Sequence, residues 1–458
     1  MSFAMLCWNK ILTFLFLGWA ANHFVTGHGG RTAREQRQCT VIPLGPLQND
    51  VPQIQKAFEE CNNGGRVIFL SGQTYRIAEK IRVNITNVEI DWSGVWLVSI
   101  AKHGCNIGLT LREMTSDLDY WRKNSFPVAF QNHAAGIVFS GSDITINANG
   151  IGGVHGNGEA WYSDEMTVVK PGRPMPFVLW NVSNVAVHGF SVWQPPLWGF
   201  NIMGGFNIEV TNLYVNATAA KAPWGANWLK NTDGFDTMDV NNCTLSGLTY
   251  QGGDDCIAIK PRSYNIGISN VTCRGGNGIA VGSLGQYEED SSVVNVTVRD
   301  VKIKRYNEDM HNSAQIKTWI GVPALQGKSD YESAGLPRGG GTGVARNITF
   351  TNFEVEGADA GPFITQNSGK TKRSASGTSK MEVSQIIFEN FSGYLSDAAK
   401  KEGVIGGVSC SKVKPCHDIA FKDIKLRIGK NAIGNDIAGK CTDNAKGGVT
   451  GLSGGGCE

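Results

Sequence analysis

Residues 242–274 read NCTLSGLTYQGGDDCIAIKPRSYNIGISNVTCR, and this stretch contains one structural phrase twice. NCTLSGLTY begins at Asn242, and NIGISNVTC begins 23 residues later at Asn265. In each copy an Asn precedes apolar residues that alternate with polar ones, which is the pattern of a short half-buried strand. Similar phrases begin at Asn84, Asp143, Asn184, Asn207, Asn295, Asn347, Gln385 and Asp418.

The repeat predicts the fold class. Short strands that recur every ~20–30 residues, without a sustained helical period, indicate an all-β, single-domain parallel solenoid. Each coil would give one strand to each of about three sheets, and successive coils would stack ~4.8 Å apart. Asn and Gly suit the corners, where φ is positive. The 58 Gly among 458 residues fit many such corners, and the absence of a Gly-X-Y period excludes collagen.

Two features of the N-terminal region precede the repeat. Lys10 and the apolar run from Ile11 to Ala21, which ends in small residues, are typical of a secretory signal peptide and too short to span a bilayer. We therefore expect a signal peptide over residues 1–21, an extension over 22–38 and the solenoid domain over 39–458. A signal anchor is the alternative, because the first eight residues are also rather apolar.

Apolar residues at helical spacing from Val51 to Phe58, followed by Gly64 and Gly65, predict a short helix. Such a helix would cap the open strand edges of the first coil. The formal net charge of +2 excludes a basic footprint for nucleic acid and a polybasic membrane arm.

Cysteines and glycosylation motifs both point to an exported chain. Ten cysteines remain after the leader, an even number that indicates disulfides. Cys39 with Cys61, Cys410 with Cys416 and Cys441 with Cys457 are candidate pairs, although the sequence leaves connectivity open. The cysteines show no CxxC spacing, so the sequence does not predict a structural metal site. Eight Asn-x-Ser/Thr motifs indicate glycosylation in a eukaryotic host: Asn84, Asn181, Asn216, Asn242, Asn270, Asn295, Asn347 and Asn390.

Carboxylates recur at one-coil intervals in the middle of the chain. Asp254 lies 21 residues after Asp233, and Asn277 lies 22 residues after Asp255. We expect these residues to stack on three consecutive coils. Because close carboxylates repel one another and raise each other's pKa, the stack favours chemistry over structure. Two carboxyl groups ~6.5–9.5 Å apart can protonate a glycosidic oxygen and activate a water molecule.

The carboxylate stack has alternative interpretations. The aspartates could cap corners, or Asp254 and Asp255 could bind calcium. We expect Asp236 to be structural or to support the others. Neighbours such as Asp254 and Asp255 would point to opposite faces of a regular strand, so Gly252 and Gly253 must permit a bulge.

These motifs together resemble the family 28 glycoside hydrolases, the polygalacturonases and their relatives. The resemblance rests on Asn231-Thr232-Asp233, Gly253-Asp254-Asp255, Gly276-x-Gly278 and Ile316-Lys317, and it extends from about Cys39 onward. It implies a right-handed parallel β-helix and inverting hydrolysis. It also implies that Asp254 is the general acid, that Asp233 and Asp255 activate water, and that a Cys256–Cys273 disulfide lies beside the site.

The chain departs from the family pattern at two positions. Asn277 stands where the family has a His, and Gln315 stands where it has the Arg of an Arg-Ile-Lys motif. Losing the Arg removes a bidentate fork that fits a carboxylate, so the sugar preference could change. We assign Lys317, Gln315, Tyr287 and Asn231 to substrate binding.

Two segments resemble the exo-acting branch of the family. They are Gly282–Tyr287 and an extra segment from Tyr120-Trp121 to Gln131-Asn132-His133, and they would wall off one end of a cleft. Tyr287, Trp319 and Trp121 are candidate sugar platforms. Lys260, Arg262 and Arg274 are candidates, with Lys317, for a local positive field.

The sequence therefore predicts a secreted, monomeric exo-glycosidase that removes terminal α-linked galacturonate from pectic chains. It predicts no cofactor, no metal, no nucleic-acid partner and no membrane attachment after cleavage of the leader. An α-L-rhamnosidase is the main alternative, motivated by Asn277 and Gln315. A non-catalytic carbohydrate-binding solenoid and a calcium-dependent lyase are weaker alternatives.

Overall fold

The computed structural model describes residues 36–99, 118–162, 172–219, 229–306, 310–325, 337–369, 375–401, 403–433, 438–442, 445 and 448–457. Residues 36–458 form one compact unit, distinct from residues 1–35. The expected signal peptide, the extension up to residue 35 and Cys105 lie outside the described residues. No helix in the described part of the chain is long and apolar enough to cross a membrane.

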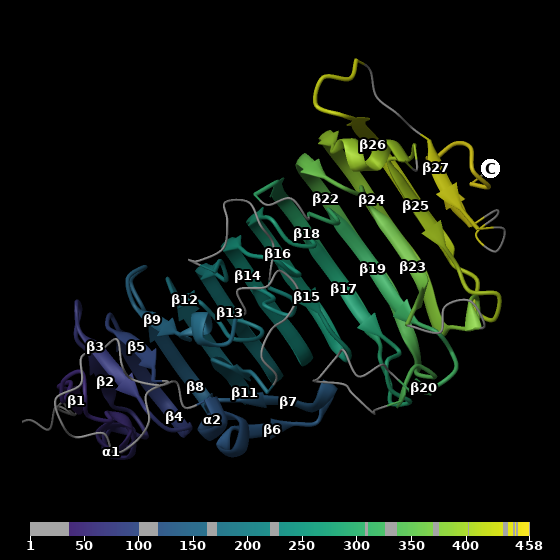
Figure 1. Ribbon diagram of the computed structural model, residues 1–458. Helices are drawn as coiled ribbons and strands as arrows, with labels where there is room; N and C mark the ends of the chain where they lie inside the picture. The colour runs from purple at the N-terminus through teal and green to yellow at the C-terminus, as the bar shows by residue number, and fades with distance from the viewer. Residues whose placement is uncertain are drawn as a thin grey trace, which may run out of the picture. The chain divides into compact units, whose positions relative to one another are not determined.

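The long strands of the compact unit pair in parallel with the preceding and following coil, in the order of the sequence (Figure 1). They bend around corners, so that a single long strand contributes to more than one face. These long strands are β4 (Ile81–Trp92), β8 (Ile137–Asn147), β11 (Phe177–His188), β13 (Phe200–Asn216), β14 (Phe235–Gln251), β16 (Ser263–Arg274), β18 (Val293–Lys304), β22 (Thr342–Ala358), β24 (Lys380–Leu395) and β26 (His417–Ile428).

Short strands form the remaining columns. One column continues the sheet of β14 and contains β15 (Ile257–Ile259), β17 (Ile279–Leu284), β19 (Ala314–Trp319), β23 (Phe363–Ser368), β25 (Gly406–Ser409) and β27 (Gly439–Cys441). A second column joins the end of β13 and contains β3 (Thr74–Ile77), β5 (Val95–Val98), β9 (Gly153–His155) and β12 (Ser191–Trp193). The ends of the stack carry β1 (Gln38–Val41), β2 (Arg66–Phe69) and β28 (Val449–Thr450). The architecture is the expected right-handed parallel β-helix.

The corners confirm the role predicted for Asn. Every phrase start named above has a positive φ except Asn84, near which Asn87 takes that role. The corner amides also bond from coil to coil: Asn295 Nδ2 donates to Asn265 Oδ1 at 2.9 Å, and Asn347 Nδ2 donates to Asn295 Oδ1 at 2.8 Å. We call these stacked corner amides the asparagine ladder. Its members include Asn242 and Asn390, so four predicted glycosylation sites use their amide nitrogen in the ladder.

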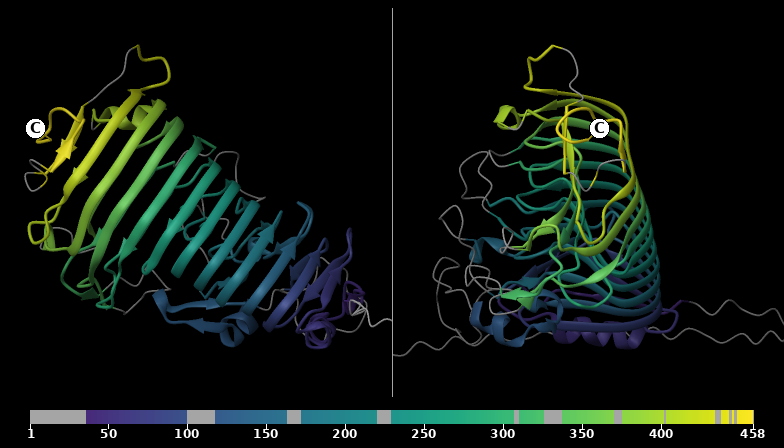
Figure 2. Two further views of the ribbon diagram at one scale, coloured as in Figure 1. Left: turned by 180° about the vertical axis from the view of Figure 1, so that it is seen from behind. Right: turned by 90° about the vertical axis from the view of Figure 1, so that its right-hand side faces the viewer.

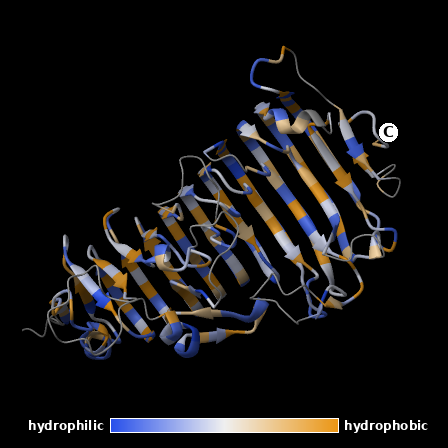
Figure 3. Ribbon diagram, viewed as in Figure 1, coloured by the Kyte–Doolittle hydropathy of each residue, from blue (hydrophilic) through white to orange (hydrophobic). Residues whose placement is uncertain are grey.

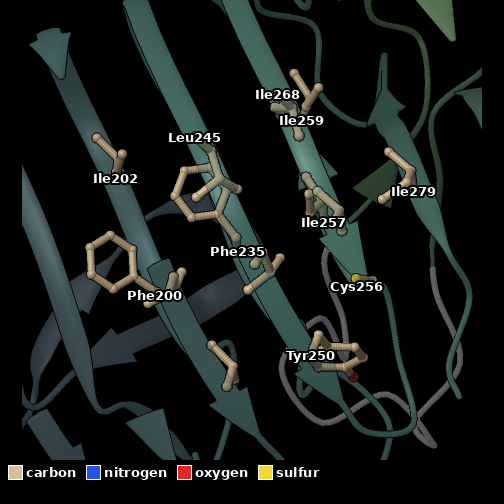
Figure 4. Close-up of a cluster of buried hydrophobic side chains, with 14 of the residues drawn as sticks. Phe200, Ile202, Phe235, Leu245, Tyr250, Cys256, Ile257, Ile259, Ile268 and Ile279 are labelled. Atoms are coloured by element: carbon tan, nitrogen blue, oxygen red, sulfur yellow. The ribbon is translucent and has the colours of Figure 1, made fainter. Parts of the chain in front are cut away.

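The interior of the coils is filled by like side chains stacked on one another. Strand residues alternate between apolar and polar, which gives the banded pattern of Figure 3. Phe200 and Phe235 stack with ring centroids 5.8 Å apart, and Ile257 and Ile279 continue the same column on the next two coils (Figure 4). Such continuous burial holds adjacent coils in register.

The predicted cap and disulfides are confirmed. Helix α1 (Val51–Cys61) buries the face that includes Ile54 and Phe58 and lies at the first coil (Figure 2). All three candidate cysteine pairs form, and so does Cys256–Cys273. Cys243, on β14, is a buried free thiol. Side chains alternate between the two faces of β14, and the Cys243 side chain is on the face that points into the apolar core. Burial there raises the pKa of its thiol to about 12.

An insertion between β5 and β8 packs on the outer side of the β-helix. It contains helix α2 (Leu118–Asn124), β6 (Phe126–Val128), the single turn η1 (Phe130–Asn132) and β7 (His133–Ala135), and β7 pairs with β10 (Pro174–Met175). Val128 and Phe130 form a separate apolar cluster with Trp198, Met203 and Met238. Smaller elements elsewhere are η2 (Gly158–Ala160), η4 (Asp397–Lys401), β20 (Ala324–Leu325) and β21 (Pro337–Arg338).

Candidate active site

The predicted carboxylate stack forms at one edge of the short-strand column. Asp233 precedes β14, Asp254 and Asp255 precede β15, and Asn277 precedes β17. Backbone bonds fix these neighbours: Gly234 N donates to Asp255 O at 2.9 Å, and Asn277 N donates to Asp254 O at 3.0 Å. The three aspartates and Asn277 therefore occupy adjacent coils at one place, as the spacing of 21 and 22 residues predicts.

The carboxylates lie closer together than expected. One oxygen from each of Asp233, Asp254 and Asp255 lies within 4.8 Å of the others. These nearest oxygens are closer than the ~6.5–9.5 Å that separates the two carboxyl groups of an inverting pair. The reason is that Asp254 and Asp255 both belong to the turn before β15 and are not on an extended strand, so both reach the same side as Asp233.

Two lysines neutralise part of this charge. Lys260 Nζ lies 3.2 Å from Asp233 Oδ2 and 3.0 Å from Asp236 Oδ1, and all three side chains are almost fully buried. Lys317 Nζ lies 2.7 Å from Asp255 Oδ2. The two ammonium groups compensate part of the negative charge that would attract a calcium ion, which disfavours the calcium alternative. As expected, Asp236 supports the stack by sharing Lys260 with Asp233.

Asp254 is held by three hydrogen bonds. Its Oδ2 accepts from Asn231 N at 2.5 Å, and its Oδ1 accepts from Asp255 N at 2.8 Å and from Asn277 Nδ2 at 2.9 Å. Asn277, at the position where the resemblance implies a His, thus contacts the residue expected to be the acid. Asn231 contributes its backbone to Asp254, and its positive φ turns the N–H toward the carboxylate.

Tyr250 positions the turn that carries the two neighbouring aspartates. Its buried hydroxyl donates to Thr232 O at 3.1 Å and accepts from Asp254 N at 3.1 Å. A Cβ on Gly252 would lie 2.3 Å from this hydroxyl, which explains why glycine is needed there. The Cys256–Cys273 disulfide ties the same turn to β16.

Burial and mutual repulsion shift the acid–base properties of the stack. Burial, followed by the charge of Asp255, raises the pKa of Asp254. Burial and Asp236 raise the pKa of Asp233 well above its ordinary value, while Lys260 opposes that shift. Burial raises the pKa of Asp236 to about 6. Burial lowers the pKa of Lys260, but Asp236 and Asp233 outweigh it, so the lysine stays charged.

Two carboxylate oxygens have room for a further partner. Asp233 and Asp255 each use Oδ2 to bind a lysine, while Oδ1 of each is buried without a hydrogen-bond partner in the described part of the chain. Buried polar atoms normally find a partner, protein or water. The site therefore has two neighbouring carboxylate acceptors suited to one water molecule.

The other predicted residues occupy different environments. Gln315 lies on β19 with only 9% of its surface exposed, one coil from Ala280. The Tyr287 hydroxyl accepts from Gln131 N at 3.1 Å, and its ring packs against Phe130, so it holds the insertion. Trp121 is not a platform, because it is buried and donates to Ser99 O at 2.8 Å. Trp319 is largely buried as well.

The basic residues proposed as a positive field divide into two groups. Lys260 and Lys317 reach the carboxylates, whereas Arg262 pairs with Asp239 and Glu289 at a corner, and Arg274 is exposed at the end of β16. The specific role of Lys260 was missed. Ala258 pairs with Asp236 on the neighbouring strand, and Lys260 lies two residues after Ala258 on the same face. Strand alternation could therefore have indicated that Lys260 reaches the aspartates.

The insertion reaches this site through a chain of ring contacts. The His133 ring meets Trp198 edge-to-face with centroids 4.4 Å apart, and Lys260 Nζ lies 3.9 Å from the centre of the Trp198 ring. On the next coil, Gln131 Nε2 donates to Gln286 Oε1 at 2.8 Å. The two segments expected to wall off the cleft are thus bonded to each other beside the carboxylates.

Comparison with known proteins agrees with this geometry. Residues 113–441 match the model of the glycosyl hydrolases family 28. The chain is 53% identical to a putative galacturan 1,4-alpha-galacturonidase C of Aspergillus niger, covering 96% of this chain and 97% of that protein. It is 31% identical to an exopolygalacturonase of Cochliobolus carbonum, covering 85% of this chain and 81% of that protein.

Solved structures share the fold. An endo-xylogalacturonan hydrolase from Aspergillus tubingensis superposes with a TM-score of 0.69 at 24% identity, covering 91% of this chain and all of that one. Endopolygalacturonase I from Stereum purpureum superposes with a TM-score of 0.57 at 18% identity, covering 90% and 98% of the two chains. The chain belongs to family 28 of the glycosyl hydrolases.

Proposed function

We propose that this enzyme is an exo-acting glycosidase of pectin breakdown that hydrolyses terminal α-linked galacturonate. The names of the similar fungal proteins support the reaction and the sugar. The observation that carries the proposal is the arrangement of three clustered carboxylates: one is held by three donors, and two keep an oxygen that has no hydrogen-bond partner among the described residues.

Asp254 is the proposed general acid. Burial and the neighbouring Asp255 raise its pKa, so it retains a proton at a higher pH than an exposed aspartate does. Asn231 N, Asp255 N and Asn277 Nδ2 hold the carboxyl group in one orientation and stabilise the carboxylate left after protonation of the leaving oxygen. No cofactor is needed for this transfer.

Asp233 and Asp255 are the proposed water-activating pair. Each binds a lysine through Oδ2, and their Oδ1 atoms, which have no hydrogen-bond partner among the described residues, can accept both hydrogens of one water molecule. That water would attack the anomeric carbon in a single inverting step. Because the oxygens of the stack lie within 4.8 Å of each other, inversion needs a direct test, by NMR of the first anomer released.

The insertion supports exo action. Its contacts with Trp198, before β13, and with Gln286 and Tyr287, after β17, hold it beside the coils that carry the carboxylates. A chain terminus would abut this wall, and the remainder of the pectic chain would run toward the C-terminal coils. We also propose that the protein is secreted and monomeric, which N-terminal sequencing from culture medium and light scattering would test.

The neutral Gln315 keeps α-L-rhamnosidase as a second candidate. The deciding experiment compares digalacturonate with an aryl α-L-rhamnoside under the same conditions. We expect galacturonic acid from the first and no turnover of the second. Rapid release from the rhamnoside alone would overturn the assignment of the sugar, and release of long fragments from polygalacturonate would overturn exo action.

A further inference from the structure

The indole ring of Trp198 lies between the insertion and the carboxylate stack. Trp198 is almost fully buried and belongs to the apolar cluster that Val128 and Phe130 of the insertion form with the coils. The His133 ring meets it edge-to-face, and Lys260 Nζ lies 3.9 Å from its centre. The proposed reaction assigns no role to this ring.

The backbone fixes Trp198 directly beside the proposed base. Asn201 Nδ2 donates to Trp198 O and to Phe177 O, both at 3.0 Å. The next residue, Gly199, donates its N–H to Asp233 O at 2.8 Å, and a Cβ at Gly199 would lie 3.2 Å from that oxygen. Trp198 and Asp233 are therefore joined twice, once through the backbone and once through Lys260.

Lys260 uses the indole as the third side of its binding pocket. Two of its sides are occupied by Asp233 Oδ2 at 3.2 Å and Asp236 Oδ1 at 3.0 Å. An aromatic face attracts a cation, and the attraction is stronger where water is excluded. The ring of Trp198 thus shields the ammonium group from water and holds it against the two carboxylates.

His133 contacts the same ring without adding a charge. Burial, followed by the cations Lys260, Arg173 and Arg338, lowers the pKa of His133 well below its ordinary value. The imidazole is therefore neutral at the pH of a working enzyme, and it can pack on Trp198 without repelling Lys260.

We propose that Trp198 is a positioning residue for the water-activating base: its ring holds Lys260 against Asp233 and connects the insertion to that base. The inference rests on the proposed function and deepens it, because the insertion then supports the chemistry as well as closing the cleft. The other charged groups around Asp233, Lys260 and His133 are unchanged in the test below; they are Asp236, Asp254, Asp255, Lys317, Arg173 and Arg338.

The test measures kcat/KM for digalacturonate against pH in Trp198→Leu and Trp198→Phe. Lys260 lowers the pKa of Asp233, so an ammonium group that is held less closely leaves that pKa higher. In Trp198→Leu we expect the acidic limb to move up by about one pH unit, with about a three- to fivefold loss of kcat/KM below the new limb. Trp198→Phe keeps an aromatic face and should retain the limb of the wild type.

Two further variants separate positioning from packing. Met203→Leu, in the same apolar cluster, is the matched control and should leave the limb in place. In a Lys260→Met background, Trp198→Leu should add no further movement of the limb, because the group through which it acts is absent. Trp198→Met, with a flexible apolar side chain, carries the same expectations as Trp198→Leu if the latter does not fold.

Three results would overturn the proposal: an unmoved limb in a folded Trp198→Leu or Trp198→Met, an equal movement in Met203→Leu, or a further movement on top of Lys260→Met. Failure of the wild type to cleave digalacturonate would instead refute the proposed function. Thermal unfolding then tests the positioning role: the loss of midpoint in Trp198→Leu should grow as rising pH ionises Asp233, whereas that in Met203→Leu should not depend on pH. Equal pH dependence in the two variants would overturn it.

Discussion

Two stacks of polar side chains run along the coils, and they differ in charge. In the asparagine ladder, neutral amides such as Asn265, Asn295 and Asn347 bond from coil to coil. In the carboxylate stack, Asp233, Asp254 and Asp255 bring like charges together and depend on Lys260 and Lys317. The same parallel register therefore produces stability at a corner and reactivity at a sheet edge.

The largest expected effect is removal of a charge from the reactive stack. Asp255→Asn takes away one water-activating carboxylate and the partner of Lys317. We expect kcat to fall about 10²- to 10⁴-fold on digalacturonate. The control is the conservative exchange Asp239→Asn at a corner of β14. Asparagine can adopt the positive φ of this position, so kcat should be unchanged. Similar losses in both variants would contradict the comparison.

Lys260→Met tests how the carboxylate stack tolerates its own negative charge. Lys260 lowers the pKa of Asp233, so its removal raises that pKa further, and a higher pH is needed to ionise the base. The acidic limb of the kcat/KM profile should therefore move to higher pH, with about a tenfold loss of kcat/KM below the new limb. Lys302→Met, an exposed lysine on β18, serves as the control. An unmoved limb would show that Lys260 does not govern the base.

Asn295→Ala tests the ladder. Alanine at the positive φ of 60° loses the amide bonds to two neighbours, and we expect about 2 kcal/mol less unfolding free energy with unchanged kcat. Asn295→Gly separates the cost of the positive φ from the loss of the amide hydrogen bonds, since glycine adopts that φ readily but has no side-chain amide. Thr297→Val removes the glycosylation motif and keeps the amide, so a loss of stability in this variant would point to a glycan instead.

The smallest effect is expected at Gln315, whose neighbour on the next coil is Phe363. Gln315→Arg restores the guanidinium that the family motif has, and a bidentate contact to galacturonate should lower KM for digalacturonate about two- to tenfold. Gln315→Met, of similar length and no charge, is the control. An identical KM in both variants would indicate that position 315 does not touch the substrate.

Much of the fold and the core of the site could be predicted because both repeat. The Asn-led phrases gave the corners, and one-coil spacing brought Asp233, Asp254 and Asp255 together. Spacing along a strand does not describe a turn, so the close approach of the carboxylates and the role of Tyr250 could not be derived. Trp121 was misassigned as a sugar platform for a related reason: composition indicates what a residue type favours, whereas burial depends on how the side chain packs in the fold.

The central claim is that the carboxylate stack is the catalytic centre, with Asp254 as the acid. The most direct measurement is kcat of Asp254→Asn on digalacturonate, alongside its thermal unfolding midpoint. We predict at least about a 10²-fold loss of kcat, with an unfolding midpoint equal to or above that of the wild type, because one buried repulsive charge is removed. Activity close to that of the wild type, in a variant folded equally well, would contradict the account.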